Sequence, residues 1–191
     1  KEGYFDSAFH VPLIVRDPDA VATRGQEVTA FTEAVDVMPT LLDSLGGEVP
    51  QTCDGRSLRA FLTEGRTPAG WRDAAMFEFD FRDVVKQGAE RHLGLAPDEC
   101  TLAVLRGARW KYVHCAGLAP LLFDLVADPQ EMHNLAGDPA YAAIERDCAQ
   151  ALLTKRLLHA ERSWTNTLLV EGGPQSYRGP RRAAERVDGA R

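Results

Sequence analysis

Few residues of this sequence have the types and spacing that catalysis or metal binding requires. Glu78 and Asp80 alternate with apolar residues in 75–81 and share one face, so they could act as a general acid and base. A solvated strand face is the favoured interpretation, because period-two alternation is typical of half-buried strands. His133 and Asn134 could form a metal pair, but we expect Asn134 to cap backbone groups in a turn.

The four cysteines are irregularly spaced and include no C-x-x-C pair. They are Cys53, Cys100, Cys115 and Cys148. This spacing argues against a zinc or redox centre and favours buried free thiols, although an even number can also pair. Free thiols persist best in a reducing compartment, so we expect a cytoplasmic location.

The composition is that of an acidic globular protein. The 191 residues are 45% hydrophobic, with a formal net charge of -6 and a pI near 5.4. Nucleic acid is not an expected partner, because binding phosphates requires a basic face, and the arginines of the C-terminal tail do not reverse the overall charge. No run approaches the roughly 18 apolar residues of a membrane span. The first residues have no signal-peptide pattern. The sequence also lacks an initiator methionine, so we expect a piece of a longer chain.

The first part of the chain predicts strands followed by a helix. Residues 11–15, V-P-L-I-V, form a short apolar run that is typical of a strand buried on both faces. His10 precedes this run, and we interpret it as a core or turn histidine. A second short strand is expected over 28–31. Residues 36–45 predict a helix with Pro39 in its first turn.

The second part predicts a small antiparallel sheet and a long helix. Strands are expected over 75–81, 101–105, 110–114 and 121–125, with the second and third forming a hairpin. Residues 84–99 are expected to form a loop or insertion. Asp138 and Pro139 predict the start of a helix that continues to about Arg162. A disordered tail is expected from Gly172, because Gly, Pro and Arg dominate there.

Four stretches, in this order, resemble the C-terminal part of sulfatases and phosphonate monoester hydrolases of the alkaline phosphatase superfamily. They are K-E-G-Y-F-D-S-A-F-H-V-P-L-I-V at 1–15, V-D-V-M-P-T-L-L at 35–42, D-G-R-S-L at 54–58, and R-W-K-Y at 109–112 with L-F-D-L and D-P-Q-E-M-H-N-L at 122–125 and 128–135. The pieces at 71–73 and 78–82 favour the phosphonate monoester hydrolase branch.

The resemblance implies an α/β fold, the C-terminal part of an alkaline phosphatase-like sulfatase fold. It would divide the chain into the end of the main α/β domain over 1–70, an antiparallel-sheet subdomain over 71–136, a helical segment over 137–171 and a disordered tail over 172–191. A parallel sheet interrupted after its first part would expose apolar strand edges, so we expect poor solubility or self-association of this chain alone.

The resemblance also implies hydrolysis of a sulfate, phosphate or phosphonate ester by a divalent metal ion (Mn, Ca, Zn or Mg) and a formylglycine nucleophile. The C/S-x-P/A-x-R nucleophile motif is absent here, since Cys53 is followed by Asp-Gly-Arg, and the metal ligands would also lie outside this chain. One site residue carries over. Lys1 matches the family lysine that neutralises the anionic ester oxygens.

Two functions follow as alternatives. The first is the C-terminal portion of a hydrolase that acts on a small anionic ester and is inactive as this chain alone; such a hydrolase could form a homo-oligomer. The second is a non-catalytic remnant that acts at most as an interaction or oligomerisation module. The residues do not distinguish sulfate from phosphonate or phosphate as the substrate group.

Overall fold

The computed structural model describes residues 3–50, 52–83, 85–160 and 167–176. The chain divides into two compact units, one made of residues 1–15 and 73–158 and the other of residues 16–72 and 159–191. No helix in the described ranges is both long enough and apolar enough to cross a membrane.

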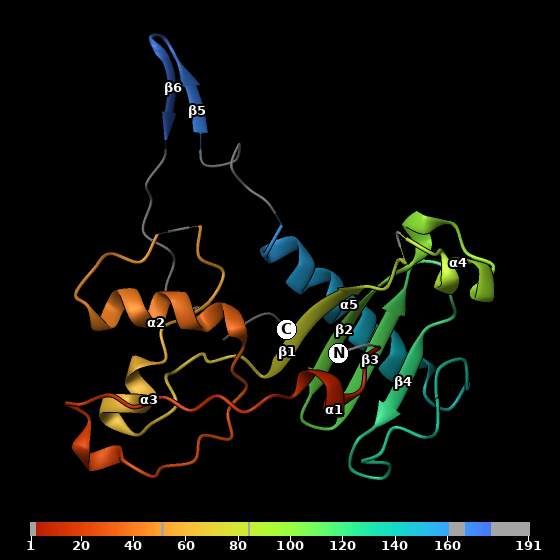
Figure 1. Cartoon of the computed structure of the whole chain (residues 1–191), viewed down its shortest axis with the longest axis horizontal. Helices are drawn as coiled ribbons and strands as arrows, with labels where there is room; N and C mark the ends of the chain where they lie inside the picture. The colour runs from red at the N-terminus through yellow and green to blue at the C-terminus, as the bar shows by residue number, and fades with distance from the viewer. Residues whose placement is uncertain (1–2, 51, 84, 161–166, 177–191) are drawn as a thin grey trace, which may run out of the picture. The chain divides into compact units, whose positions relative to one another are not determined.

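The first unit is built on a four-stranded antiparallel sheet (Figure 1). The strands are β1 (Ala74–Asp80), β2 (Thr101–Gly107), β3 (Trp110–Cys115) and β4 (Leu121–Asp124), and they are adjacent in sequence order. Met76 pairs with Leu105, and Leu105 pairs in turn with Tyr112. The four strands predicted from alternation and turn residues are therefore confirmed.

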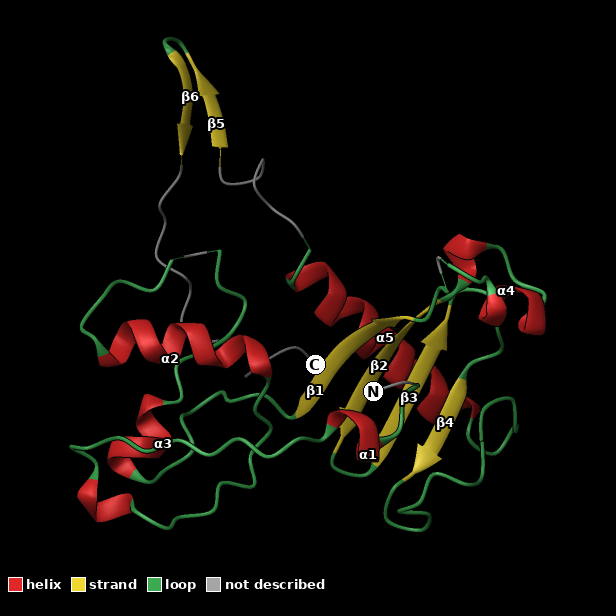
Figure 2. Cartoon of the chain, viewed as in Figure 1, coloured by secondary structure: helices red, strands yellow, loops and turns green. Residues whose placement is uncertain are grey.

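Each face of this sheet carries its own apolar cluster. Helix α5 (Ala142–Leu158) covers one face, where Leu152 packs with Leu105, Tyr112 and Leu122. The short helix α1 (Asp6–Phe9) and the residues before it cover the other face, which is centred on Val104 and Val113. Figure 2 shows α5 and α1 on opposite sides of the strands. The predicted C-terminal helix is confirmed, although it begins and ends a few residues inside the expected range.

The connection from β1 to β2 is more ordered than predicted. It contains helix α4 (Gly88–Leu93) and the 3-10 turn η3 (Pro97–Glu99) in place of a simple loop. Helix α4 ends at Gly94, which has a φ of 69° and so supplies the left-handed residue that closes many helices.

Among its described residues, the second unit contains two short 3-10 segments before its main helix and one short helix after it. They are η1 (Val21–Thr23), η2 (Ala34–Asp36), α2 (Val37–Ser44) and α3 (Arg59–Glu64) in chain order. Helix α2 confirms the helix predicted for 36–45, and Pro39 lies in its first turn as expected. A hairpin of β5 (Thr167–Val170) and β6 (Gly173–Ser176) also belongs to this unit. Residues 173–176 of the predicted disordered tail form β6, so that prediction is wrong there, and residues 177–191 lie outside the described residues.

Two predicted strands are wrong. Residues 11–15 and 28–31 contain no strand, and the side chain of Ile14 is 92% exposed. The apolar run at 11–15 has the residue types of a buried strand, but a strand forms only beside another strand that shares its hydrogen bonds. No other strand pairs with either segment among the described residues.

Candidate functional site on the segment that follows Lys1

The predicted site residue, Lys1, lies outside the described residues, so the site is built here from the residues that follow it. We call residues 3–9 the anchored segment. Its first residue, Gly3, has a φ of 83°, a left-handed conformation that an L side chain adopts with strain. The chain therefore makes a sharp turn two residues after Lys1.

Asp6 joins the anchored segment to the sheet through both of its carboxylate oxygens. Its Oδ1 accepts a hydrogen bond from Lys111 Nζ at 2.9 Å, and its Oδ2 accepts from Arg106 Nε and Nη2, each at 3.2 Å. Arg106 lies in β2 and Lys111 in β3, so Asp6 contacts two adjacent strands about a hundred residues away in sequence.

Glu131 completes the cluster from the loop after β4. Its Oε2 accepts from Lys111 Nζ at 2.7 Å, and its Oε1 accepts from the backbone N–H of Asp6 at 3.2 Å. The Lys111 side chain is fully buried and that of Glu131 is 3% exposed. We call Asp6, Arg106, Lys111 and Glu131 the Lys111 cluster; its two cations and two carboxylates balance in charge, as buried ionic groups require.

The backbone of Glu131 is unusual. Its φ is 58°, in the left-handed region that few residues other than glycine occupy. Such a conformation persists only where the surrounding structure enforces it. Here the Glu131 carboxylate contacts Lys111 and the Asp6 amide, and the Glu131 backbone N–H donates to the Asp128 carbonyl at 3.1 Å.

Aromatic rings hold the anchored segment at both ends. Tyr4 stacks on Phe123 of β4 with ring centroids 5.9 Å apart, and it also contacts Phe5. Phe9 stacks on Phe77 at 4.2 Å and meets the edge of Phe79 at 5.8 Å. Offset and edge-on aromatic pairs add to the stabilisation that burial alone provides.

The electrostatics of the segment follow from these contacts. Burial raises the pKa of Asp6, but the hydrogen bond and charge of Lys111, together with those of Arg106, outweigh it, and the net pKa lies below the ordinary value. The pKa of the Tyr4 hydroxyl is raised by burial, then by the charge of Glu131. Asp6 is therefore ionised and Tyr4 protonated at neutral pH.

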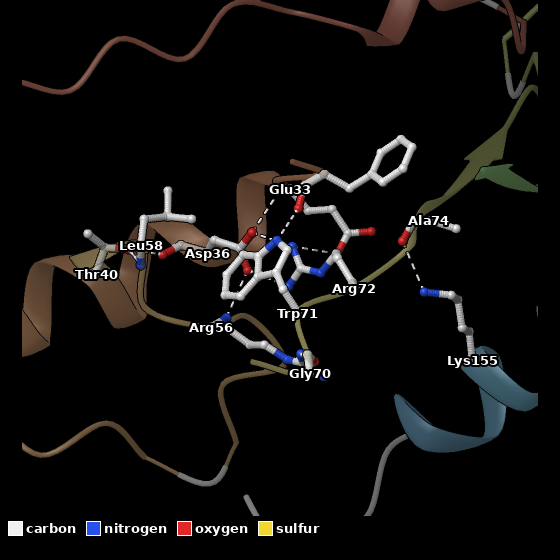
Figure 3. A network of polar contacts seen from close by, with 11 residues as sticks. Glu33, Asp36, Thr40, Arg56, Leu58, Gly70, Trp71, Arg72, Ala74 and Lys155 are labelled. Atoms are coloured by element: carbon white, nitrogen blue, oxygen red, sulfur yellow. Dashed lines mark hydrogen bonds and ion pairs between the residues drawn. The ribbon is translucent and has the colours of Figure 1, made fainter. Parts of the chain in front are cut away.

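A second buried network lies in the other unit and is structural. Asp36 accepts hydrogen bonds from the backbone N–H groups of Glu33 and Arg56, both at 2.8 Å, and from both terminal nitrogens of Arg72 (Figure 3). Asp36 is fully buried, and Arg72 also lies 3.2 Å from Glu33. All of these partners belong to the same unit as Asp36, so the carboxylate stabilises the η2–α2 turn.

The structure gives the other candidates from the sequence surface or capping positions. Glu78 and Asp80 are exposed and pair with Arg156 and Arg82, respectively. Asn134 accepts from the backbone N–H groups of Leu122 and Ala136, which confirms its capping role. His10 is exposed, so the core interpretation is wrong and a turn position remains.

The described residues offer no site for a metal ion, since no three His, Cys, Asp or Glu side chains gather among them. The four cysteines, all within the described residues, form no disulfide bond. Burial raises the pKa of Cys100, Cys115 and Cys148, so their thiols are protonated at neutral pH and are poor ligands and nucleophiles. A shallow apolar groove of about 300 Å³, lined by Leu105, Trp110, Ile144, Asp147, Cys148 and Ala151, has only one carboxylate to offer.

Sequence reasoning treated Lys111 as an ordinary strand residue and gave Asp6 and Glu131 no role. One local signal was available, because Lys111 stands beside Tyr112 and Val113 in a predicted strand. The structure shows that Lys111, Tyr112 and Val113 are all buried. A lysine on a covered face needs a carboxylate partner. Which carboxylate it meets depends on contacts 105 and 20 residues away, which local patterns do not report.

The fold is that of the C-terminal part of an alkaline phosphatase-like sulfatase, as the sequence predicted. The chain belongs to the family "N-sulphoglucosamine sulphohydrolase, C-terminal", whose model matches residues 1–158. It is similar to the multifunctional alkaline phosphatase superfamily protein PehA of Trinickia caryophylli, with 50% identity over 166 residues that cover 87% of this chain and 32% of PehA. An N-acetylglucosamine-6-O-sulfatase of Bacteroides thetaiotaomicron is 32% identical over 161 residues, 80% of this chain and 27% of that protein.

Among solved structures, the phosphonate monoester hydrolase of Agrobacterium radiobacter superposes with a TM-score of 0.84 and 50% identity. The match covers 94% of this chain and 35% of that one. The chain therefore spans about a third of the length of these relatives. The predicted fold class and family are confirmed, whereas the division at residues 70, 136 and 171 and the role of Lys1 remain predictions.

Proposed function

We propose that this chain is the C-terminal portion of a hydrolase of sulfate, phosphonate or phosphate esters. The single observation that carries the proposal is the 50% identity and TM-score of 0.84 to a phosphonate monoester hydrolase over almost the whole chain. The relatives named as sulfatases are less similar, which favours the phosphonate ester among the substrate groups.

Lys1 is the residue of this chain to which we assign a direct role. Its ammonium group would hold the anionic oxygens of the ester and neutralise the charge that develops during transfer to the nucleophile. The divalent metal ion and the formylglycine nucleophile would be held by residues outside the described part of the chain, which contains no metal-ligand cluster. The 191-residue chain alone is therefore expected to be inactive.

Two assays test this proposal. The purified 191-residue chain, supplied with manganese, calcium or zinc, should hydrolyse neither a nitrophenyl sulfate nor a phenylphosphonate ester. The full gene product that contains it should hydrolyse at least one of the two, and Lys1→Ala should lower kcat about 10²- to 10³-fold, the usual cost of removing a group that stabilises developing charge.

Lys86→Ala provides the matched control, because Lys86 is an exposed lysine of the same unit. Activity of the isolated chain above its Lys1→Ala variant would contradict the proposal, as would a full gene product without activity on either ester.

An interaction module is the alternative function, and one observation favours it. Helix α2 and the residue that follows it expose apolar side chains: Met38 is 59%, Leu41 56% and Leu45 84% exposed. Exposed apolar patches of this kind mark surfaces that another polypeptide covers. We propose that the isolated chain self-associates through such surfaces. Size-exclusion chromatography that shows a stable monomer, both for the chain and for a Leu41→Glu variant, would argue against it.

A further inference from the structure

We infer that Asp6, held by Lys111, Arg106 and Glu131, is a positioning residue that orients Lys1 toward the reacting ester. This inference rests on the proposed function, because it presumes that Lys1 contacts the ester. It adds a task for the antiparallel sheet, which otherwise carries no residue for the reaction.

The geometry of the cluster supports positioning over general stabilisation. Lys111 already has a buried partner in Glu131, at 2.7 Å, and both residues belong to the sheet and its loop. Asp6 adds a carboxylate whose two oxygens each meet a cation of a different strand. Glu131 in turn accepts from the Asp6 backbone N–H. The peptide and the side chain of Asp6 are thus both fixed, which sets the direction as well as the place of the segment.

The short distance along the chain connects this anchor with Lys1. Only Glu2, Gly3, Tyr4 and Phe5 separate Lys1 from Asp6, and the last two rings pack together with centroids 4.5 Å apart. Tyr4 is also stacked on Phe123. Tyr4, the third residue after Lys1, is therefore already fixed to the sheet. An ammonium group displaced by about 1 Å can cost on the order of 10²-fold in rate, so an anchor at this distance affects catalysis.

Asp6→Ala is the informative variant. It releases the segment, yet it leaves Lys111 paired with Glu131, so the sheet keeps a compensated buried charge. Lys111→Met would instead strand the Glu131 carboxylate and risk unfolding. Asp80→Ala is the matched control, because Asp80 also pairs with an arginine at the surface of the same sheet but does not contact the anchored segment.

The first measurement is amide hydrogen exchange in the 191-residue chain. In Asp6→Ala, amides of residues 5–10 should exchange at least about tenfold faster, while those of β2 and β3 stay as in the unaltered chain and in Asp80→Ala. Unchanged exchange of residues 5–10 would overturn the anchoring role. Faster exchange throughout the sheet would overturn it as well, because Asp6 would then be a general stabilising residue.

The second measurement is a double-mutant cycle of kcat in the full gene product. If Asp6 acts through Lys1, Asp6→Ala should lower kcat about 10- to 100-fold, and adding it to Lys1→Ala should lower kcat no further. Additive losses would overturn the positioning role while the role of Lys1 stands. A Lys1→Ala variant with unchanged kcat would overturn both, and exchange of residues 5–10 would still report whether the anchor exists.

Discussion

Removing the Asp36 carboxylate tests how the second unit is held together. Asp36 is fully buried and accepts two backbone N–H groups at 2.8 Å and a bidentate contact from Arg72, whose side chain is 7% exposed. In Asp36→Ala both amides lose this acceptor, and the Arg72 guanidinium is left with Glu33 at 3.2 Å and the ring of Trp71. Breaking a buried pair by removing one partner costs about 3–5 kcal/mol. A domain has only about 5–15 kcal/mol in total, so we expect partial unfolding of this unit.

Trp71 is a local probe for this prediction. Its indole N–H donates to the Phe31 carbonyl at 2.8 Å, and the Arg72 guanidinium lies 5.0 Å from its ring centroid. Urea unfolding followed by fluorescence, in a background with Trp110 and Trp164 replaced by Phe, therefore reports on this unit. The m-value shows whether the compared transitions expose similar surface.

The control is Asp54→Ala, which removes a carboxylate of the same unit that is 51% exposed and lies 3.3 Å from His159. Surface ion pairs contribute about 0–1 kcal/mol to stability, so the urea midpoint of Asp54→Ala should be almost that of the unaltered chain. If Asp36→Ala shifted the midpoint no more than this control, the network would not be the interaction that secures the turn, and our reasoning from burial would be wrong.

Two further predictions use the same chain. Gly55→Ala should destabilise the second unit by about 3 kcal/mol, because a Cβ there would lie 1.9 Å from the Val35 carbonyl oxygen. In Gly46→Ala the new Cβ meets open space, so this variant should lose only about 1–2 kcal/mol, the cost of a left-handed conformation. Urea unfolding followed by Trp71 fluorescence compares the two variants, and equal losses of stability would contradict the steric argument. Since the folded pKa of Asp6 lies below its unfolded value of 3.8, its contribution is fully present above about pH 4 and is lost as pH falls through the folded pKa. Unfolding followed by Trp110 fluorescence should therefore weaken less on acidification in Asp6→Asn than in the unaltered chain, and identical pH profiles would refute this.

The local elements were readable from the sequence. Alternation with a period of two identified β1, and β-prone runs separated by turn residues identified β2, β3 and β4. Pro39 and Asp138 lie close to the starts of their helices. These signals are local, because strand and helix periodicity and the first turn of a helix involve residues a few positions apart. The ordered run of motifs also identified the family correctly.

The partners of the charged side chains were decided only by the tertiary structure. Asp6 meets Lys111 across 105 residues and Asp36 meets Arg72 across 36, and residue types alone do not specify such pairings. The same limit explains residues 11–15, whose apolar run predicts a strand but which have none beside them among the described residues. Sequence by itself determined the strands of the antiparallel sheet, helices α2 and α5, the family and the assignment of Lys1 by resemblance. Tertiary structure decided what holds the residues after Lys1, because a hydrogen bond or ion pair exists only where folding brings its two partners together.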